Sequence, residues 1–345
     1  MRIGCHNLSL PLIQGGMGVG VSLSSLAGHV AKKGAMGVIS TAQIGFKKAL
    51  FQKNVREANK EAIDEEIKKA KEISEGHGMV AVNVMVALSD YEEHVRQAVK
   101  NGVDAVISGA GLPLKLPEYV NEDTCIAPIV SSGKAARLIL NKWKRNYERT
   151  ADFIVIEGSK AGGHLGFKKE ELLSHTCASL KEILRDVKEV IKVFEEHFKH
   201  PIPVFVAGGI YTNEDIKEML EAGADGVQMG TRFIGTYECD ASLEYKNYFI
   251  NAKKEDIQIV QSPVGMPGRA FKTPFMNDTH PIKRCFKCIS SCHITNVPYC
   301  ITQALIDAVE GRCEDGLVFT GSNGYRIDRL VHVDELIDEL MEGIV

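Results

Sequence analysis

Short apolar runs alternate with longer amphipathic stretches eight times between residues 12 and 229. Each run is dominated by apolar residues and ends at Gly, Ser, Asn or another polar residue, which is typical of a buried strand. The strands predicted from this pattern cover residues 12–14, 36–40, 80–85, 105–108, 126–131, 153–157, 204–207 and 226–229.

The stretches between these runs place apolar residues at helical spacing. They predict helices at residues 22–33, 64–75, 91–100, 134–147, 180–197 and 213–221, with a weaker one at 113–120. Eight strand–helix units with near-continuous apolar strands favour an α/β fold of the closed (β/α)8 type, a TIM barrel. A doubly wound sheet is the alternative, but the glycines within residues 15–20 do not match its G-x-G-x-x-G fingerprint.

A further hydrophobic pattern follows the barrel. Residues 301–309 and 333–341 predict two amphipathic helices, and the glycine-containing loop 321–324 between them either closes over a ligand or is a simple turn. We therefore expect a cofactor-binding barrel over residues 1–254 and a C-terminal helical, cysteine-bearing extension over residues 255–345.

Two consecutive strand-to-loop turns have the composition of a phosphate site. Ala207-Gly208-Gly209 ends the seventh predicted strand, and Gly230-Thr231 ends the eighth. Glycines let backbone N–H groups approach a ligand closely, and the loops after strands seven and eight of a barrel frequently bind phosphate. The pair of turns points to a flavin phosphate, with two ordinary strand-to-helix turns as the alternative.

Other predicted strand ends also carry glycine or polar residues. Gly15, Gly16 and Met17 form a loop after the first strand that could lie against a flat aromatic ring or be a flexible turn. Asn83 and Gln228 are amides in otherwise buried runs. Each therefore needs a hydrogen-bond partner, which could be a bound ligand or another protein group.

A glycine-built loop after the sixth predicted strand presents a single histidine. The loop starts at Glu157 and continues through Ala161, Gly162 and Gly163 to His164. A neutral imidazole at this place could donate or accept a proton near a substrate at physiological pH. A histidine on an exposed loop is the alternative.

Composition narrows the function classes. The 345 residues carry a formal net charge of -4, so the chain has no overall basic character for binding nucleic acid. No apolar run approaches the length that spans a bilayer, and the sequence begins without a signal-peptide core. We expect a cytoplasmic protein that does not insert into a membrane.

Cysteines are concentrated near the C-terminus. Five of the nine follow residue 284, which argues against a secreted disulfide framework. Cys285, Cys288, Cys292 and Cys300 have the spacing C-x2-C-x3-C-x7-C, dense enough to bring four thiolates onto one metal ion or iron–sulfur cluster. The spacing matches neither the bacterial ferredoxin run nor the two-pair zinc ribbon, so reduced cysteines that pack a loop are the alternative.

Taken in order, these motifs resemble the nitronate monooxygenase family, formerly called 2-nitropropane dioxygenases, and the related FMN-dependent enoyl-ACP reductases of type II. The resemblance runs from Pro11 to about Phe275 and includes Gly268-Arg269-Ala270. It implies FMN as the cofactor and His164 as the catalytic residue over the flavin. The residues implied to line the cofactor are Gly15, Gly16, Met17, Asn83, Glu157, Ala161, Gly162, Gly163, Ala207, Gly208, Gly209, Gln228, Gly230 and Thr231.

The resemblance implies oxidation of a small-molecule alkyl nitronate with O2 to a carbonyl compound and nitrite, and a homodimer is one option for the assembly.

Two positions depart from the family pattern. Lys160 stands where many members have an acidic residue, and Glu157 stands where many monooxygenases have Gln and enoyl reductases often have Glu. NAD(P)H-dependent enoyl reduction therefore stays an alternative, as does a flavin or cluster protein that carries electrons or senses redox state without turnover.

Overall fold

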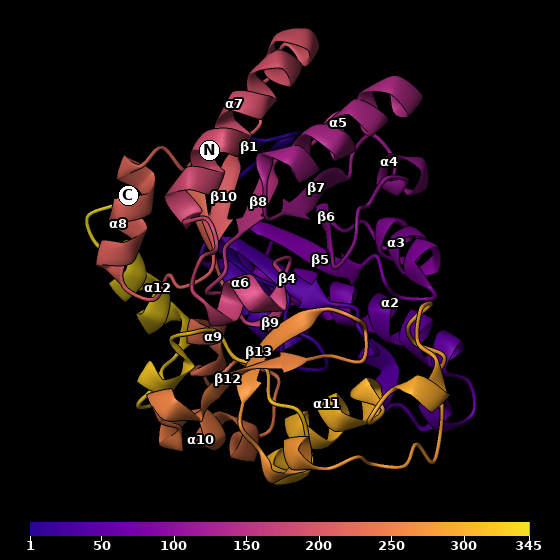
Figure 1. Cartoon of the computed structure of the whole chain (residues 1–345). Helices are drawn as coiled ribbons and strands as arrows, with labels where there is room; N and C mark the ends of the chain where they lie inside the picture. Colours follow the sequence, from indigo (N-terminus) through magenta and orange to yellow (C-terminus); the bar gives the residue numbers. More distant parts are fainter. Residues whose placement is uncertain (345) are drawn as a thin grey trace.

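The structure, a computed structural model, describes residues 1–344 and contains a closed barrel of eight parallel strands (Figure 1). In chain order the strands are β3 (Leu12–Gln14), β4 (Met36–Ser40), β5 (Met79–Met85), β6 (Ala105–Gly109), β7 (Cys125–Val130), β8 (Ile154–Glu157), β10 (Val204–Ala207) and β11 (Gly226–Met229). Strand β11 pairs with β3 and closes the ring. The predicted TIM barrel is confirmed, and every predicted strand boundary lies within one residue of the observed one.

Helices surround the barrel. They are α1 (Ser24–Lys32), α2 (Val55–Ser74), α3 (Tyr91–Lys100), α4 (Leu116–Tyr119), α5 (Gly133–Tyr147), α7 (Leu180–Phe198) and α8 (Asn213–Glu221). The largest error of prediction concerns α2, which begins at Val55 rather than at residue 64. Asn54 caps this helix by accepting a hydrogen bond from the Glu57 N–H (3.2 Å), a local signal that the apolar periodicity did not reveal.

The amino end of the barrel is closed by hydrophobic side chains. A short hairpin of β1 (Arg2–Ile3) and β2 (His6–Asn7) precedes the barrel. Ile3 and Leu8 are buried in the same cluster as barrel residues such as Ile107 and Phe205. With this end packed, the carboxyl ends of the strands are left for a binding site, as is general for this fold.

A small antiparallel sheet lies at the carboxyl end of the barrel. It is formed by β12 (Ile257–Gln261), β13 (Pro267–Phe271) and β9 (Gly163–His164), in that order. Strand β9 belongs to the loop that follows β8, so this loop is tied to the extension through the pairs Gly268–His164 and Arg269–Gly163. The division of the chain at residue 254 stays a prediction.

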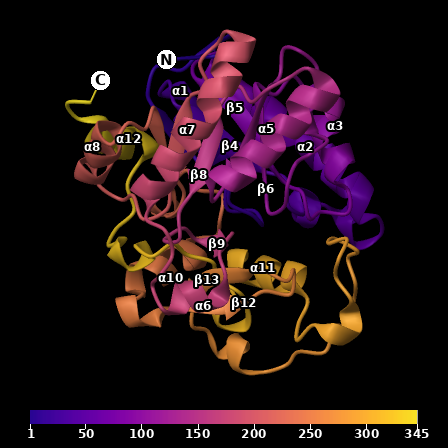
Figure 2. The ribbon, with the colours of Figure 1, turned by 45° about the horizontal axis from the view of Figure 1, so that its top comes forward.

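The remaining α-helices lie in the extension and in the connecting loops. They are α6 (Lys169–Leu173), α9 (Thr231–Ile234), α10 (Leu243–Asn251), α11 (Ile301–Val309) and α12 (Val333–Met341). Figure 2 shows α10, α11 and the small sheet grouped on one side of the barrel. Helix α12 returns to pack against α1 and α8, so the extension contacts both the mouth and the flank of the barrel.

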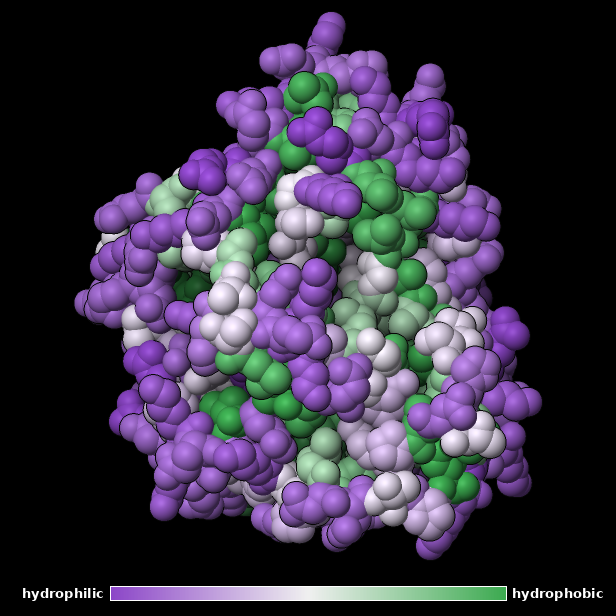
Figure 3. Space-filling model, viewed as in Figure 1, coloured by the Kyte–Doolittle hydropathy of each residue, from purple (hydrophilic) through white to green (hydrophobic). Residues whose placement is uncertain are grey.

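The face seen in Figure 1 is covered mainly by hydrophilic side chains, with hydrophobic ones scattered between them (Figure 3). Among residues 1–344, no helix combines the length and the apolar character needed to cross a bilayer.

Candidate active site

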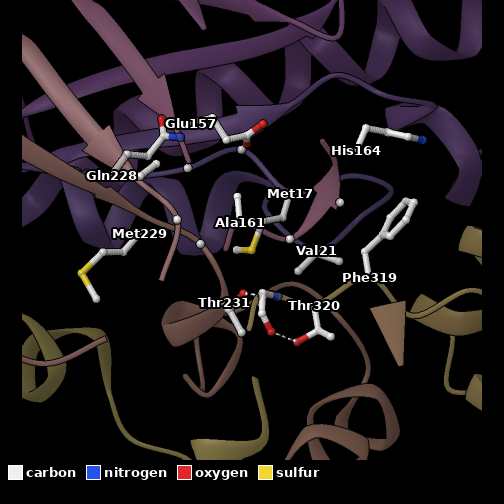
Figure 4. Close-up of a pocket in the computed structure, with 18 of the residues that line it drawn as sticks. Met17, Val21, Glu157, Ala161, His164, Gln228, Met229, Thr231, Phe319 and Thr320 are labelled. Atoms are coloured by element: carbon white, nitrogen blue, oxygen red, sulfur yellow. Dashed lines mark hydrogen bonds between the residues drawn. The ribbon is translucent and has the colours of Figure 1, made fainter. Parts of the chain in front are cut away.

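A cavity of about 250 Å³ lies at the carboxyl ends of the barrel strands. All of the predicted catalytic and cofactor-lining residues line it: Gly15, Gly16, Met17, Asn83, Glu157, Ala161, Gly162, Gly163, His164, Ala207, Gly208, Gly209, Gln228, Gly230 and Thr231. Figure 4 shows several of them around the cavity. Folding therefore places in one cavity residues that lie up to 216 positions apart in the sequence.

Strand register explains how the polar residues meet. In the parallel sheet Ala207 pairs with Glu157 on one side and with Gln228 on the other. These three positions end neighbouring strands at one level, so Glu157 and Gln228 face the same part of the cavity (Figure 4). The sequence locates the end of each strand, but only the pairing of β8, β10 and β11 brings these three strand ends together.

The first glycine loop packs directly on the two predicted amides. A Cβ atom at Gly16 would lie 2.5 Å from the Cβ of Asn83, and one at Gly15 would lie 3.1 Å from the side chain of Gln228. Residues with side chains would push this loop away from the strands that carry the amides. The two glycines thus let the loop form one wall of the cavity close to Asn83 and Gln228.

The loop 321–324, for which the sequence allowed either a ligand cover or a simple turn, connects the two predicted phosphate turns. The Gly321 N–H donates to Thr231 Oγ1 (3.0 Å), and the Asn323 side-chain amide donates to the Gly209 carbonyl (2.8 Å). Thr320, Gly321, Ser322 and Asn323 all line the cavity. This loop is therefore part of the cavity wall and not a turn distant from it. Its glycines were the feature of the sequence that indicated a loop here.

His164 is held in a defined orientation. Its Nε2 lies 2.7 Å from Ser262 Oγ, and its ring packs edge-on against Phe319 at a centroid distance of 5.0 Å. Burial lowers the pKa of His164 to about 4, so the ring is neutral at pH 7. This environment differs from an exposed loop, which was the alternative for His164.

The hydrogen bonds of Ser262 suggest which ring nitrogen carries the proton. Ser262 Oγ accepts a bond from the Val264 N–H (3.4 Å), which leaves the hydroxyl proton free to donate to His164 Nε2. In a neutral ring whose Nε2 accepts, the proton resides on Nδ1. His164 would then offer a substrate one N–H donor, on Nδ1.

Replacing Ser262 with alanine should lower kcat for the predicted nitronate oxidation about tenfold. The substitution removes a hydrogen bond of about 1.4 kcal/mol that fixes the orientation of the His164 ring. Flavin affinity should change little, since Ser262 does not line the cavity. Steady-state kinetics and flavin titration measure the two effects. S174A, at an exposed serine on the loop after α6, is the control, and equal kcat values for S262A and S174A would contradict the orienting role of Ser262.

Glu157 is a partly buried acid in the cavity wall and has no charged partner. Burial alone raises its pKa from the usual 4.5 to about 8. The carboxyl group is therefore protonated at pH 7 and can donate a hydrogen bond into the cavity. Among the described residues that line the cavity, Lys160 is the only lysine or arginine.

The raised pKa of Glu157 predicts a pH dependence of stability. Between about pH 4.5 and about pH 8 the folded protein keeps a proton that the unfolded chain has lost, so unfolding becomes easier as pH rises. Relative to wild type, E157Q should gain about 1.4 kcal/mol of unfolding free energy per pH unit across this range. Urea denaturation of the flavin-free proteins at several pH values measures the difference, and parallel curves would show that Glu157 ionises normally.

The cavity also contains residues that no motif identified. Tyr245 of α10 lines it, as do Leu305 of α11 and Phe319, which belong to the extension. They are ordinary apolar or aromatic residues in the sequence, and only the packing of the extension brings them to the barrel mouth.

The four clustered cysteines lie outside this cavity. Cys285, Cys288, Cys292 and Cys300 are free thiols, and none of them lines it. Across residues 1–344, no group of three or more His, Cys, Asp or Glu side chains is arranged as a metal site.

Known proteins share both the sequence pattern and the fold. A family model described as nitronate monooxygenase matches residues 1–343. A probable nitronate monooxygenase of Staphylococcus saprophyticus is 26% identical over 193 residues, which are 56% of this chain and 51% of that protein. The match thus spans about half the length of this relative.

Two solved structures have the same fold. FabK from Thermotoga maritima is 23% identical with a TM-score of 0.69, and the match covers 97% of this chain and 92% of that chain. Nitroalkane oxidase from Streptomyces ansochromogenes is 20% identical with a TM-score of 0.72, covering 96% and 95%. Since the family model matches almost the whole chain, this protein belongs to the nitronate monooxygenase family.

Proposed function

We propose that this protein is an FMN-dependent oxidoreductase that oxidises alkyl nitronates with O2 to carbonyl compounds and nitrite. The observation that carries the proposal is the convergence of all the predicted FMN-lining residues and His164 on one cavity. Family membership supports the same reaction, since relatives carry the name nitronate monooxygenase.

The residues present fit FMN. The backbone around Gly208, Gly209, Gly230 and Thr231 suits a phosphate, because glycine φ angles of +104° and +90° at Gly208 and Gly209 open the turn. At the strand ends that flank Ala207, the neutral acid Glu157 and the amide of Gln228 supply a donor and a mixed donor–acceptor for the edge of a flavin ring. When bound, FMN supplies the capacity to accept electrons from the substrate.

The protein's own groups have distinct tasks in this reaction. His164, neutral and fixed by Ser262, hydrogen-bonds to the nitronate through its N–H. Lys160 contributes positive charge at the cavity, which favours an anionic substrate. Phe319, packed on the His164 ring, covers one side of the imidazole and limits its contact with water.

Anaerobic stopped-flow spectroscopy of the FMN-loaded protein tests this function. Rapid loss of the oxidised flavin absorption on mixing with propyl-2-nitronate, but not with NADH or NADPH, is the expected result. Nitrite release in air should follow. A protein that binds no FMN would contradict the proposal, and one whose flavin reacts with neither reagent would instead fit an electron carrier or redox sensor.

Enoyl-thioester reduction is the second candidate, and Glu157 favours it. This residue matches the acid that enoyl reductases often carry at this place, and its raised pKa gives it a proton to donate at neutral pH. The same mixing experiment separates the two functions, because the reductase requires rapid reduction of the flavin by NADH or NADPH.

A further inference from the structure

A second cavity of about 380 Å³ lies directly behind one wall of the first. Lys160, Gly208, Gly209 and Ile210 line both cavities, so these residues form a thin partition between them. The proposed reaction gives the second cavity no role. Its presence nevertheless affects the site, because open space behind the partition means that few packed atoms support it from that side.

The side chain of Arg269, in β13, reaches the partition from the second cavity, which it lines. Its Nη1 donates a hydrogen bond to the carbonyl of Ala161 (2.5 Å), the residue that follows Lys160. Ala161 itself lines the first cavity (Figure 4). The guanidinium therefore holds, from the side of the open space, the chain segment that leads to His164.

The backbone of Arg269 holds the same loop at a second point. It pairs with Gly163 in the small sheet, two residues after Ala161. The Arg269 carbonyl also accepts a hydrogen bond from the N–H of Thr320 (3.1 Å), which lines the first cavity. One arginine thus connects the loop before His164 to the wall segment around Thr320.

The backbone bonds of the partition come from the loop itself or from the first cavity. The Ala161 N–H donates to the Gly158 carbonyl (3.1 Å), within the loop. The Ser322 N–H donates to the Lys160 carbonyl (3.1 Å), and Ser322 lines the first cavity but not the second. These bonds leave the Ala161 carbonyl to Arg269, whose side chain approaches from the opposite side.

The charge of Arg269 strengthens this contact. Burial lowers the pKa of its guanidinium, and the two acids that line the second cavity are bonded elsewhere. Asp215 accepts from two backbone N–H groups at the start of its own helix, and Glu218 pairs with Lys181 (2.8 Å). A hydrogen bond from a charged donor is about twice as strong as a neutral one. Its loss should therefore release the Ala161 carbonyl toward the open space behind it.

We propose that Arg269 is a positioning residue, which keeps the loop from Lys160 to His164 in place as a wall of the first cavity and prevents it from moving back into the second. Its effect on the reaction rests on the proposed function, because Arg269 acts through the cofactor cavity and through His164. Its effect on the position of the loop does not depend on which reaction the protein catalyses.

NMR of the full chain, labelled with 13C at its histidines, tests the proposal without any reaction. The pKa of His164 is expected at about 4 in wild type. In R269M it should rise toward the ordinary value of 6.5, because a displaced loop lets water reach the ring. The spectrum of H164A identifies the resonance.

FMN titration gives a second measurement on the same variant. R269M should bind FMN about tenfold more weakly, as expected for the loss of one hydrogen bond from a charged group that holds the cavity wall. R269K should lie closer to wild type in both measurements, because its ammonium can donate to the same carbonyl. If R269M does not fold, R269Q, which is two bonds shorter and remains polar, gives the same comparison.

R284M is the matched control. Arg284 is also half-buried, lines neither cavity, and donates to the backbone carbonyls of Phe51 (3.1 Å) and Gln52 (2.8 Å). Both variants should lose thermal stability, but only R269M should change the pKa of His164 and the affinity for FMN.

Two outcomes separate this proposal from the proposed function. A pKa of His164 that stays at about 4 in R269M, with an FMN Kd within about twofold of wild type, would show that Arg269 contributes only to stability and would overturn the positioning role. If both quantities change in R269M while nitronates fail to reduce the flavin of wild type, the proposed function is wrong and the positioning role of Arg269 is supported.

Discussion

Replacing His164 with alanine is expected to lower kcat/KM for a nitronate by about 100- to 10 000-fold, the usual contribution of a side chain that donates or accepts a proton in the transition state. The expectation follows from its place in the cavity and from its contacts with Ser262 and Phe319, which fix a neutral imidazole. Steady-state nitrite production measures the loss. FMN titration determines whether the variant still binds the cofactor.

H197A is the control for His164, because His197 is an exposed histidine at the end of α7. Its kcat/KM should match that of wild type. If H164A retained kcat/KM within about twofold while binding FMN normally, His164 would have no part in the reaction. A twofold change in kcat/KM corresponds to only about 0.4 kcal/mol of transition-state free energy.

Replacing Gly208 with alanine is expected to weaken FMN binding by about 10- to 100-fold, which corresponds to about 1.4–2.8 kcal/mol. A Cβ atom at this position would lie 2.9 Å from the Gly158 carbonyl oxygen and 3.0 Å from the Ala161 nitrogen. Both neighbours are backbone atoms of the loop that leads to His164, so neither can move without displacing that wall of the cavity. Flavin fluorescence titration measures the affinity.

G223A separates backbone strain from close packing. Gly223 has a φ of +99°, similar to the +104° of Gly208, but a Cβ atom there would meet no heavy atom within 4 Å. Both variants should therefore lose stability through φ, while only G208A should lose FMN affinity. Equal FMN affinities of the two variants would show that the contact between the Gly158–Ala161 loop and Gly208 has no influence on the cofactor site.

Much of the candidate site could be predicted because its residues lie in local motifs. The glycine turns after β10 and β11, the loop ending in His164 and the amides in β5 and β11 each stand out within a few residues of sequence. The structure places all of them around one cavity. Their roles in binding FMN and substrate remain predictions that the variants described above test.

The partners of these residues could not be predicted, because they come from distant segments. Ser262 lies 98 residues from His164, and Gly321 lies 90 residues from Thr231. A serine in a hairpin or a glycine in a loop has no local property that identifies its partner. The neutral state of His164 and the raised pKa of Glu157 are also products of burial, which depends on the packed structure.

The sequence by itself determined the alternation of strands and helices and the boundaries of the barrel strands, because the apolar periodicity and the turn residues act over a few positions. It also determined the order of the strands in the barrel, since eight successive strand–helix units favour one closed topology. Tertiary structure alone decided that β9, in the loop after β8, pairs with β13 and that Gly321, Ser322 and Asn323 line the cavity. Those contacts depend on how the extension packs on the barrel, and the free energy of that packing is distributed over residues far apart in the chain.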